Sequence, residues 1–263
     1  MRTATTLLTS PPFRELGYWL YRYRRTWRGS IVISVANPLL FLTAIGIGLG
    51  QLVDTGSAYL HGASYLEFVV PGMLTAAVMQ TAYLEAAGPV LQSVRSRGSY
   101  RAAATTPLDP ADIFAGHLMY WTLRAAQNAL LFTLIAAAFG AVPPVRVVPL
   151  VLAATLVGCA FAAPTAAWAV TVRRSASLNT MFRFVVLPLY MLSGTFFPVE
   201  QLPGWLHPVA WLTPLWHGVE LSRTLALGTA VPSATLPHLG YLLAMALGGV
   251  LVARRTYRRR LHV

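Results

Sequence analysis

The chain has 263 residues, of which 56% are hydrophobic and only 11% are charged. Soluble domains average about 25% charged residues, so this chain has too little polar surface to cover a water-soluble globule. Its net charge of +12 comes entirely from arginine, because the sequence contains no lysine. Without lysine there is no ordinary P-loop, which excludes a conventional ATP site on this chain. In so apolar a chain the positive charge indicates basic loops at a membrane surface, and no nucleic-acid partner is expected.

The first predicted element, residues 10–28, is an amphipathic helix that lies in the membrane interface. Apolar residues recur at helical spacing: Phe13, Leu16, Leu20, Tyr23 and Trp27. Most of the arginines of this segment lie off that stripe, as expected if they reach the lipid headgroups. The alternative is a basic tail beside the membrane that only sets the orientation of the chain.

Six segments are long and apolar enough to cross a hydrocarbon core of about 30 Å. They are 31–53, 66–88, 113–141, 147–172, 178–197 and 236–253. The predicted fold class is therefore an all-α membrane protein with six transmembrane helices, and residues 1–263 form one transmembrane domain.

The arginines predict the orientation of these helices. Sixteen of the 20 lie before the first segment, between the second and third, between the fourth and fifth, or after the sixth. By the positive-inside rule these regions are cytoplasmic, which places both termini in the cytoplasm and agrees with an even number of spans. We expect a multi-pass protein of the bacterial cytoplasmic membrane.

The loop at 92–111 contains a short helix, predicted at about 97–104 and ended by Pro107. Asp109 is suited to cap the next helix, with Pro110 in its first position and Asp112 in its first turn. A short helix held between two spans can act as a lever for a cytoplasmic partner. An ordinary basic loop that fixes topology is the equally weighted alternative.

The segment at 195–228 contains many prolines and tryptophans. Its prolines break continuous helix, yet the segment is too apolar for a solvated loop. Short helices that re-enter or rest on the outer leaflet satisfy both conditions. A purely structural aromatic cap is the alternative to contact with a substrate.

Several polar residues lie at membrane depth and are candidates for a pathway or for internal pairing. They are Asn37, Gln80, Glu85, Arg124, Gln127, Asn128 and Arg183. Buried charge in a bilayer is costly and usually faces a partner or water. Arg124 and Arg183 can pair with Glu85 or Glu67, or extend to the inner surface, and structural pairing is favoured over a role in ligand binding.

Catalytic and metal-binding patterns are absent from the sequence. There is no H-E-x-x-H, no G-x-S-x-G and no Cys/His cluster with metal-ligand spacing. We therefore expect no catalytic residue and no metal on this chain.

Two stretches together resemble a known family. The turn Ala-Thr-Thr-Pro-Leu-Asp-Pro-Ala-Asp-Ile precedes the third span, and Leu-Ser-Gly-Thr-Phe-Phe-Pro-Val-Glu-Gln-Leu-Pro-Gly-Trp-Leu follows the fifth. With the order of spans, these resemble the permease subunits of ABC type-2 exporters over essentially the whole chain. The stretch at 65–85 is similar to that of the nodulation-type lipo-oligosaccharide and daunorubicin-resistance-type permeases.

The resemblance implies an assembly and roles for particular residues. Such permeases form a homodimer or pair with a closely related permease, and they contact membrane lipids. They bind two copies of an ABC ATPase, and that ATPase carries the ATP and the magnesium. No cofactor is therefore expected on this chain. The implied residues that couple to the ATPase are Arg97, Gly98, Ser99, Tyr100, Arg101, Thr106 and Pro107. The interfacial helix, with Arg14, Glu15, Tyr18, Arg22 and Arg25, would help to hold the ATPase. The implied extracellular gate contains Gly194, Phe197, Pro198, Glu200 and Trp205.

The leading functional hypothesis is export of an amphipathic, lipid-linked or drug-like substrate, driven by ATP. An ion-coupled secondary transporter is a second reading, but the spans show no matching pair of broken helices and no acidic relay. A membrane-embedded transferase is a third reading. Only Asp109 and Asp112 come close to the acidic cluster it would need, and their spacing suits a helix start better.

Overall fold

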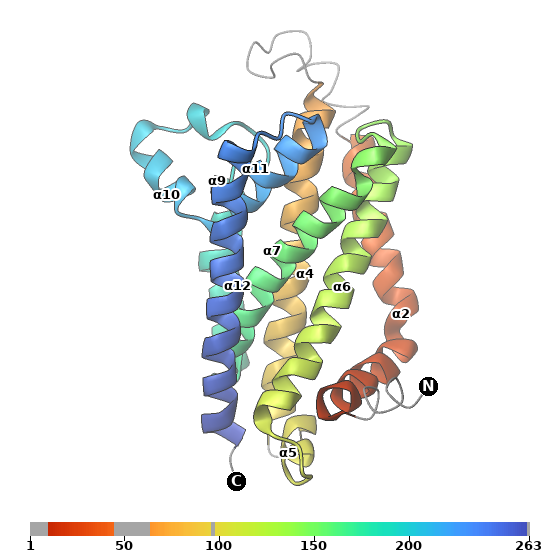
Figure 1. Ribbon diagram of the computed structural model, residues 1–263, viewed down its shortest axis with the longest axis vertical. Helices are drawn as coiled ribbons and strands as arrows, with labels where there is room; N and C mark the ends of the chain where they lie inside the picture. Colours follow the sequence, from red (N-terminus) through yellow and green to blue (C-terminus); the bar gives the residue numbers. More distant parts are fainter. Residues whose placement is uncertain (1–9, 45–63, 96–97, 262–263) are drawn as a thin grey trace.

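The computed structural model describes residues 10–44, 64–95 and 98–261, and every regular element in these ranges is helical. Long helices run along a common direction and form a bundle (Figure 1). They are α2 (Pro11–Thr43), α4 (Tyr65–Val94), α6 (Pro110–Ala138), α7 (Val147–Ala169) and α12 (Pro232–Leu261). The all-α prediction is confirmed for the described residues.

Shorter elements connect the long helices. One further long segment consists of α8 (Ser175–Met181), the π-helical turn η4 (Phe182–Val186) and α9 (Leu187–Leu192). The remaining elements are α5 (Ser99–Ala104), η3 (Pro144–Arg146), η5 (Val199–Gln201), η6 (Gly204–Leu206), α10 (His207–Trp211) and α11 (Pro214–Leu227). The prediction of short, proline-separated helices within 195–228 is confirmed, with α11 as the longest of them.

Three helical stretches in the described residues are long and apolar enough to cross a membrane: Pro144–Ala169, Ser175–Leu192 and Pro232–Leu261. They correspond to the fourth, fifth and sixth predicted spans. The helices α2, α4 and α6 have 33, 30 and 29 residues, and about 20 suffice for a span. These three helices are long enough to cross a membrane, but they are less apolar than the three stretches named above. Each contains polar groups whose partners lie inside the bundle.

The N-terminal segment differs from its prediction in one respect. It is not a separate helix, because α2 continues from Pro11 to Thr43 and takes in the start of the predicted first span; the rest of that span, 45–53, lies outside the described residues. The first part of α2 lies across one end of the bundle and the later part rises beside α6 (Figure 1). The face of α2 that is buried in the bundle lies beside the predicted apolar stripe. Glu15 and Trp19 are buried, whereas Leu20 and Trp27 are 39% and 43% exposed.

Helix ends follow the local chemistry of the sequence. The Asp109 carboxylate accepts a hydrogen bond of 2.6 Å from the Ala111 amide at the start of α6, which confirms the predicted N-cap. Ser64 and Glu67 form a reciprocal capping box at the start of α4. The helix α5 ends at Ala104, before Pro107.

The two ends of the bundle are formed by different elements. The start of α2, the short helix α5 and the end of α12 lie at one end, and α10 and α11 lie at the other (Figure 1). The arginines at 254–260 therefore lie at the same end as α5 and the first turns of α2.

A glycine allows α2 to approach α6 closely. A Cβ atom at Gly116 of α6 would come within 2.6 Å of the Glu15 Cβ atom, whereas a Cβ atom at Gly88 of α4 would meet nothing within 4 Å. The contact that holds the first turns of α2 on the bundle therefore depends on the missing side chain at Gly116.

We expect Gly116→Ala to destabilise the protein by about 1–3 kcal/mol, because α2 must move away from α6 to accommodate the methyl group. The control Gly88→Ala should be neutral or slightly stabilising, since alanine is the better helix former. Thermal unfolding in detergent, followed by size-exclusion chromatography, measures both. Equal stability of the two variants would contradict the close contact.

Candidate functional site

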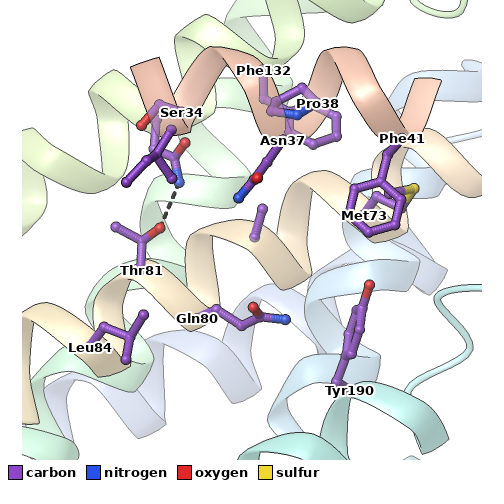
Figure 2. Close-up of a pocket in the computed structure, with 13 residues that line it drawn as sticks. Ser34, Asn37, Pro38, Phe41, Met73, Gln80, Thr81, Leu84, Phe132 and Tyr190 are labelled. Atoms are coloured by element: carbon purple, nitrogen blue, oxygen red, sulfur yellow. Dashed lines mark hydrogen bonds between the residues drawn. The ribbon is translucent and has the colours of Figure 1, made fainter. Parts of the chain in front are cut away.

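A cavity of about 160 Å³ lies among α2, α4, α6 and α9. In Figure 2 Asn37 from α2, Gln80 from α4 and Tyr190 from α9 reach toward the same space. Asn37, Phe41 and Leu84 are exposed at its rim, so the cavity opens to the outside of the bundle.

The polar groups of the cavity are neutral. Asn37, Gln80 and Asn128 contribute amides from different helices, and Asn128 Nδ2 donates a 2.8 Å hydrogen bond to Thr81 Oγ1. An amide offers both donors and acceptors without charge. This lining suits hydroxyl, ether or amide groups of a ligand better than an ionised group.

The rest of the cavity is apolar and aromatic, with Phe41, Met73 and Phe132 among its lining residues. Sites that enclose a drug-sized ligand usually measure about 300–1,000 Å³. The cavity of one chain therefore has room for only part of such a molecule.

An ion pair lies next to the cavity and joins three helices. Arg124 of α6 is 5% exposed, and its Nε lies 2.8 Å from Glu85 Oε1 of α4. The same guanidinium donates to the Tyr23 hydroxyl at 2.9 Å and to Ser30 Oγ, both on α2. Of the partners that the sequence left open for Arg124, Glu85 is the one that it contacts.

This ion pair and the cavity are one structural unit. Glu85 lies one helical turn from Thr81 on α4, and Arg124 lies one turn from Asn128 on α6, so both charges are placed on the helix faces that form the cavity. The pair therefore fixes the positions of the helices that carry the amides.

The other predicted partners do not take part in this pair. Glu67 is occupied in the capping box of α4. Arg183 lies in η4 and is exposed, and no ion pair joins it to a carboxylate within the described ranges.

At the α5 end of the bundle, four buried aromatic side chains form a cluster that joins four helices. We call Trp19 of α2, Tyr100 of α5, His117 of α6 and Tyr257 of α12 the Tyr100 cluster. The Tyr100 hydroxyl hydrogen-bonds to His117 Nδ1 and lies 3.3 Å from the Tyr257 hydroxyl. The Trp19 ring stacks on the His117 ring with a centroid distance of 3.6 Å. A movement of α5 must therefore displace α2, α6 and α12.

A buried carboxyl group borders the Tyr100 cluster. Glu15 is 5% exposed and accepts a 2.8 Å hydrogen bond from Trp19 Nε1. Burial raises the pKa of the Glu15 carboxyl to about 7, and the hydrogen bond from Trp19 opposes this shift only in part. Burial likewise raises the pKa of Tyr100 well above its usual value, so this phenol stays neutral when Glu15 titrates.

At the end of the bundle opposite to α5, Arg223 of α11 links the turn at Gly194 to α4. Its Nη2 donates to the Gly194 carbonyl at 2.6 Å, its Nη1 lies 2.5 Å from Glu220 Oε1, and its guanidinium lies 3.9 Å from the centre of the Phe68 ring. Gly194 has a φ of +75°, a conformation that favours glycine. The gate prediction did not include Arg223, although a buried arginine in an apolar segment is a recognisable signal.

The structure brings some predicted site residues together and separates others. Asn37, Gln80 and Asn128 share the cavity, and Tyr100 meets α2 through the Tyr100 cluster. The remaining predicted gate residues are more exposed, with Trp205 at 74% and Glu200 also exposed. The predicted residue Arg97 lies outside the described residues. Of the residues predicted for the interfacial helix, Arg14, Tyr18, Arg22 and Arg25 are exposed, whereas Glu15 is buried.

Three members of the Tyr100 cluster were not predicted from the sequence. Trp19 lies off the apolar stripe of α2, and His117 and Tyr257 lie on helices far apart in the chain. A histidine within a predicted membrane span is the one sequence signal that could have drawn attention to this cluster.

Comparison with known proteins identifies the class. The profile of the ABC-2 type transporter family matches residues 18–227, and the chain belongs to this family. It is 29% identical over 254 residues to Nodulation protein J of Rhizobium meliloti (strain 1021), covering 92% of this chain and 94% of that protein. It is 28% identical to Nodulation protein J of Rhizobium leguminosarum bv. viciae, covering 92% and 95%. It is also 24% identical over 201 residues to the inner membrane transport permease YadH of Escherichia coli (strain K12), covering 76% and 77%.

Family membership makes the chain an ABC type-2 permease, the membrane subunit of a transporter. It implies a multi-pass protein of the bacterial inner membrane that works with an ABC ATPase subunit.

Removal of one partner of the Arg124–Glu85 pair should destabilise the protein strongly. We expect Arg124→Met to cost about 3–5 kcal/mol, because the Glu85 carboxylate stays buried without its cation. The double variant Arg124→Met/Glu85→Leu should recover much of this loss. Thermal unfolding of both variants and of the exposed control Arg183→Met tests this, and additive losses in the double variant would refute the coupling.

The raised pKa of Glu15 predicts a pH-dependent stability. A carboxyl group whose pKa rises on folding from 4.5 to about 7 stabilises the folded state fully below pH 4.5, and this stabilisation is lost as the pH rises through about 7. The loss amounts to roughly 3 kcal/mol. We expect Glu15→Gln to flatten the pH dependence of the melting temperature between pH 5 and 8. The exposed control Glu200→Gln should keep the slope of the parent protein, and an unchanged slope in Glu15→Gln would disprove the assignment.

Proposed function

We propose that this chain is the membrane-spanning subunit of an ATP-driven exporter. It would cross the cytoplasmic membrane six times with both termini in the cytoplasm, as one domain. It would act as a homodimer, or with a closely related permease, together with two copies of an ATPase that carries the ATP and magnesium. Its substrate would be amphipathic, lipid-linked or drug-like, and would move outward.

The observation that carries this proposal is the attachment of α5. Tyr100 anchors α5 in the Tyr100 cluster, while Arg101 and Ala102 are exposed beside it. A force applied to the exposed face of α5 is therefore transmitted to α2, α6 and α12. This arrangement supports the role of a coupling helix for Gly98, Ser99, Tyr100 and Arg101.

The cavity supports the proposed class of substrate. Its neutral amides and aromatic walls suit the polar part of an amphipathic molecule, and its exposed rim offers access from the lipid side. Because one cavity has room for only part of a large substrate, two chains that face each other would provide the full pathway. The helices that would form this contact carry exposed apolar side chains, for example Val32 and Ile33 on α2 and Phe184 in η4.

An ion-coupled secondary transporter remains the alternative, and a membrane-embedded transferase is a weaker one. The two charged groups next to the cavity, Arg124 and Glu85, are paired with each other. This pairing favours a structural role over a proton or ion relay.

The decisive experiment reconstitutes the chain with its ATPase in vesicles. We expect the chain alone to hydrolyse no ATP, and the complex to transport substrate only when ATP is present on the side of α5. Transport that is driven by a proton gradient without the ATPase would overturn the proposal.

A variant on the exposed face of α5 tests coupling itself. We expect Ala102→Glu to reduce substrate-stimulated ATP hydrolysis by about tenfold or more, because it places a buried charge in the contact with the ATPase. The matched control Ala102→Ser should retain coupling, and both variants should insert and purify normally. Full coupling in Ala102→Glu would remove this face of α5 from the contact.

A further inference from the structure

Two adjoining hollows at the α5 end of the bundle are lined by arginines. One, of about 470 Å³, lies beside the last turns of α12, and the other, of about 340 Å³, lies between α5 and the residues that follow α7. Thr171 and Arg260 line both hollows, so the two form a continuous surface that we call the arginine basin. Its six arginines are Arg95, Arg101, Arg173, Arg255, Arg259 and Arg260.

No carboxylate lines the arginine basin in the described part of the chain. The ion pairs found among these residues join Arg124, Arg223 and Arg258 to acidic partners, and none involves an arginine of the basin. Six guanidinium groups gathered without counter-charge repel one another. An external anion would relieve this repulsion.

Part of the basin is held in place before any ligand arrives. Arg95 Nη2 donates to Ser175 Oγ at 3.1 Å, and Arg101 Nε donates to the Val94 carbonyl at 3.1 Å. Each arginine keeps further N–H groups that can donate to another acceptor. Guanidinium groups bind phosphate through paired hydrogen bonds, which makes phosphate the anion that best fits the basin.

An apolar face leads directly to the basin along α12. Leu243, Leu247 and Leu251 are 42%, 63% and 59% exposed, and each lies about one helical turn from the next. Leu251 in turn lies one helical turn before Arg255, so this row of leucines ends beside the basin. A lipid provides an acyl chain for such a leucine face and a phosphate for the arginines beyond it. A soluble phosphate or an acidic protein surface would leave the leucine face without a partner.

We propose that the arginine basin binds an anionic phospholipid of the inner leaflet. A lipid with two phosphates, of the cardiolipin type, fits best because two hollows share Arg260. Basic pockets between helices at the cytoplasmic surface are suited to such headgroups. The choice of leaflet rests on the orientation proposed above, whereas the binding itself does not.

The test is native mass spectrometry of the purified full-length chain, titrated with cardiolipin, phosphatidylglycerol or phosphatidylethanolamine and without ATPase. We expect the affinity to fall in that order. In Arg255→Gln/Arg259→Gln the affinity for cardiolipin should fall by about thirtyfold, since each arginine near a membrane surface contributes roughly five- to sixfold. Equal affinity for all three lipids would overturn the proposal.

Matched variants distinguish lipid binding at the arginine basin from a general effect of the protein's net positive charge. Arg28→Gln/Arg254→Gln removes the same charge from exposed positions outside the basin and should keep the affinity within about twofold, because those side chains line neither hollow. An equal loss in both double variants would reduce the effect to net charge and refute the site. If Arg255→Gln/Arg259→Gln does not purify as a monodisperse protein, Arg255→Lys/Arg259→Lys tests the same prediction through loss of the paired hydrogen bonds.

Two further experiments decide whether the phosphate bound in the basin belongs to a lipid or to a soluble anion. Leu247→Gln should weaken cardiolipin binding, and millimolar inorganic phosphate should not displace the lipid. Displacement by inorganic phosphate would assign the basin to a soluble anion, and displacement by the ATPase subunit would assign it to a protein contact; either result would overturn the lipid site. Because these measurements need no transport, their failure is distinguishable from failure of the proposed export function.

Discussion

The buried pair of Arg124 and Glu85 is the interaction on which the arrangement of the bundle depends. A charge inside a bilayer is costly unless a partner neutralises it, and here the guanidinium is shared among α2, α4 and α6. The pair adjoins the cavity lined by Asn37, Gln80 and Asn128. The need to neutralise a buried charge therefore also positions the helices that line the candidate transport site.

The two ends of the bundle are held together by different kinds of interaction. At the α5 end, aromatic packing around Tyr100 joins four helices. At the opposite end, Arg223 ties the turn at Gly194 to α4 through backbone carbonyls and the Phe68 ring. Between these fixed ends, the π-helical turn η4 interrupts the helix beside the cavity, and such turns are frequent at functional sites.

Much of this could be predicted from local sequence. The helix start at Asp109, the end of α5 before Pro107 and the short helices after Gly194 all follow from cap and proline chemistry, which depends on neighbouring residues only. For Arg124 the sequence narrowed the carboxylate partner to Glu85 or Glu67, because few acidic residues lie at membrane depth. The Tyr100 cluster was not predictable, since Trp19, His117 and Tyr257 meet only when distant helices pack.

The sequence by itself determined that this protein is embedded in a lipid bilayer, that it is helical, and to which family it belongs. The length of its apolar segments, the distribution of its arginines and two short motifs can all be read directly from the chain. Only the tertiary structure decided which face of α2 is buried, which amides share a cavity and which arginines lie together. Helical periodicity defines a face but not the neighbour that covers it. For α2 a close approach at Gly116 placed Glu15 and Trp19 inside and left Leu20 exposed.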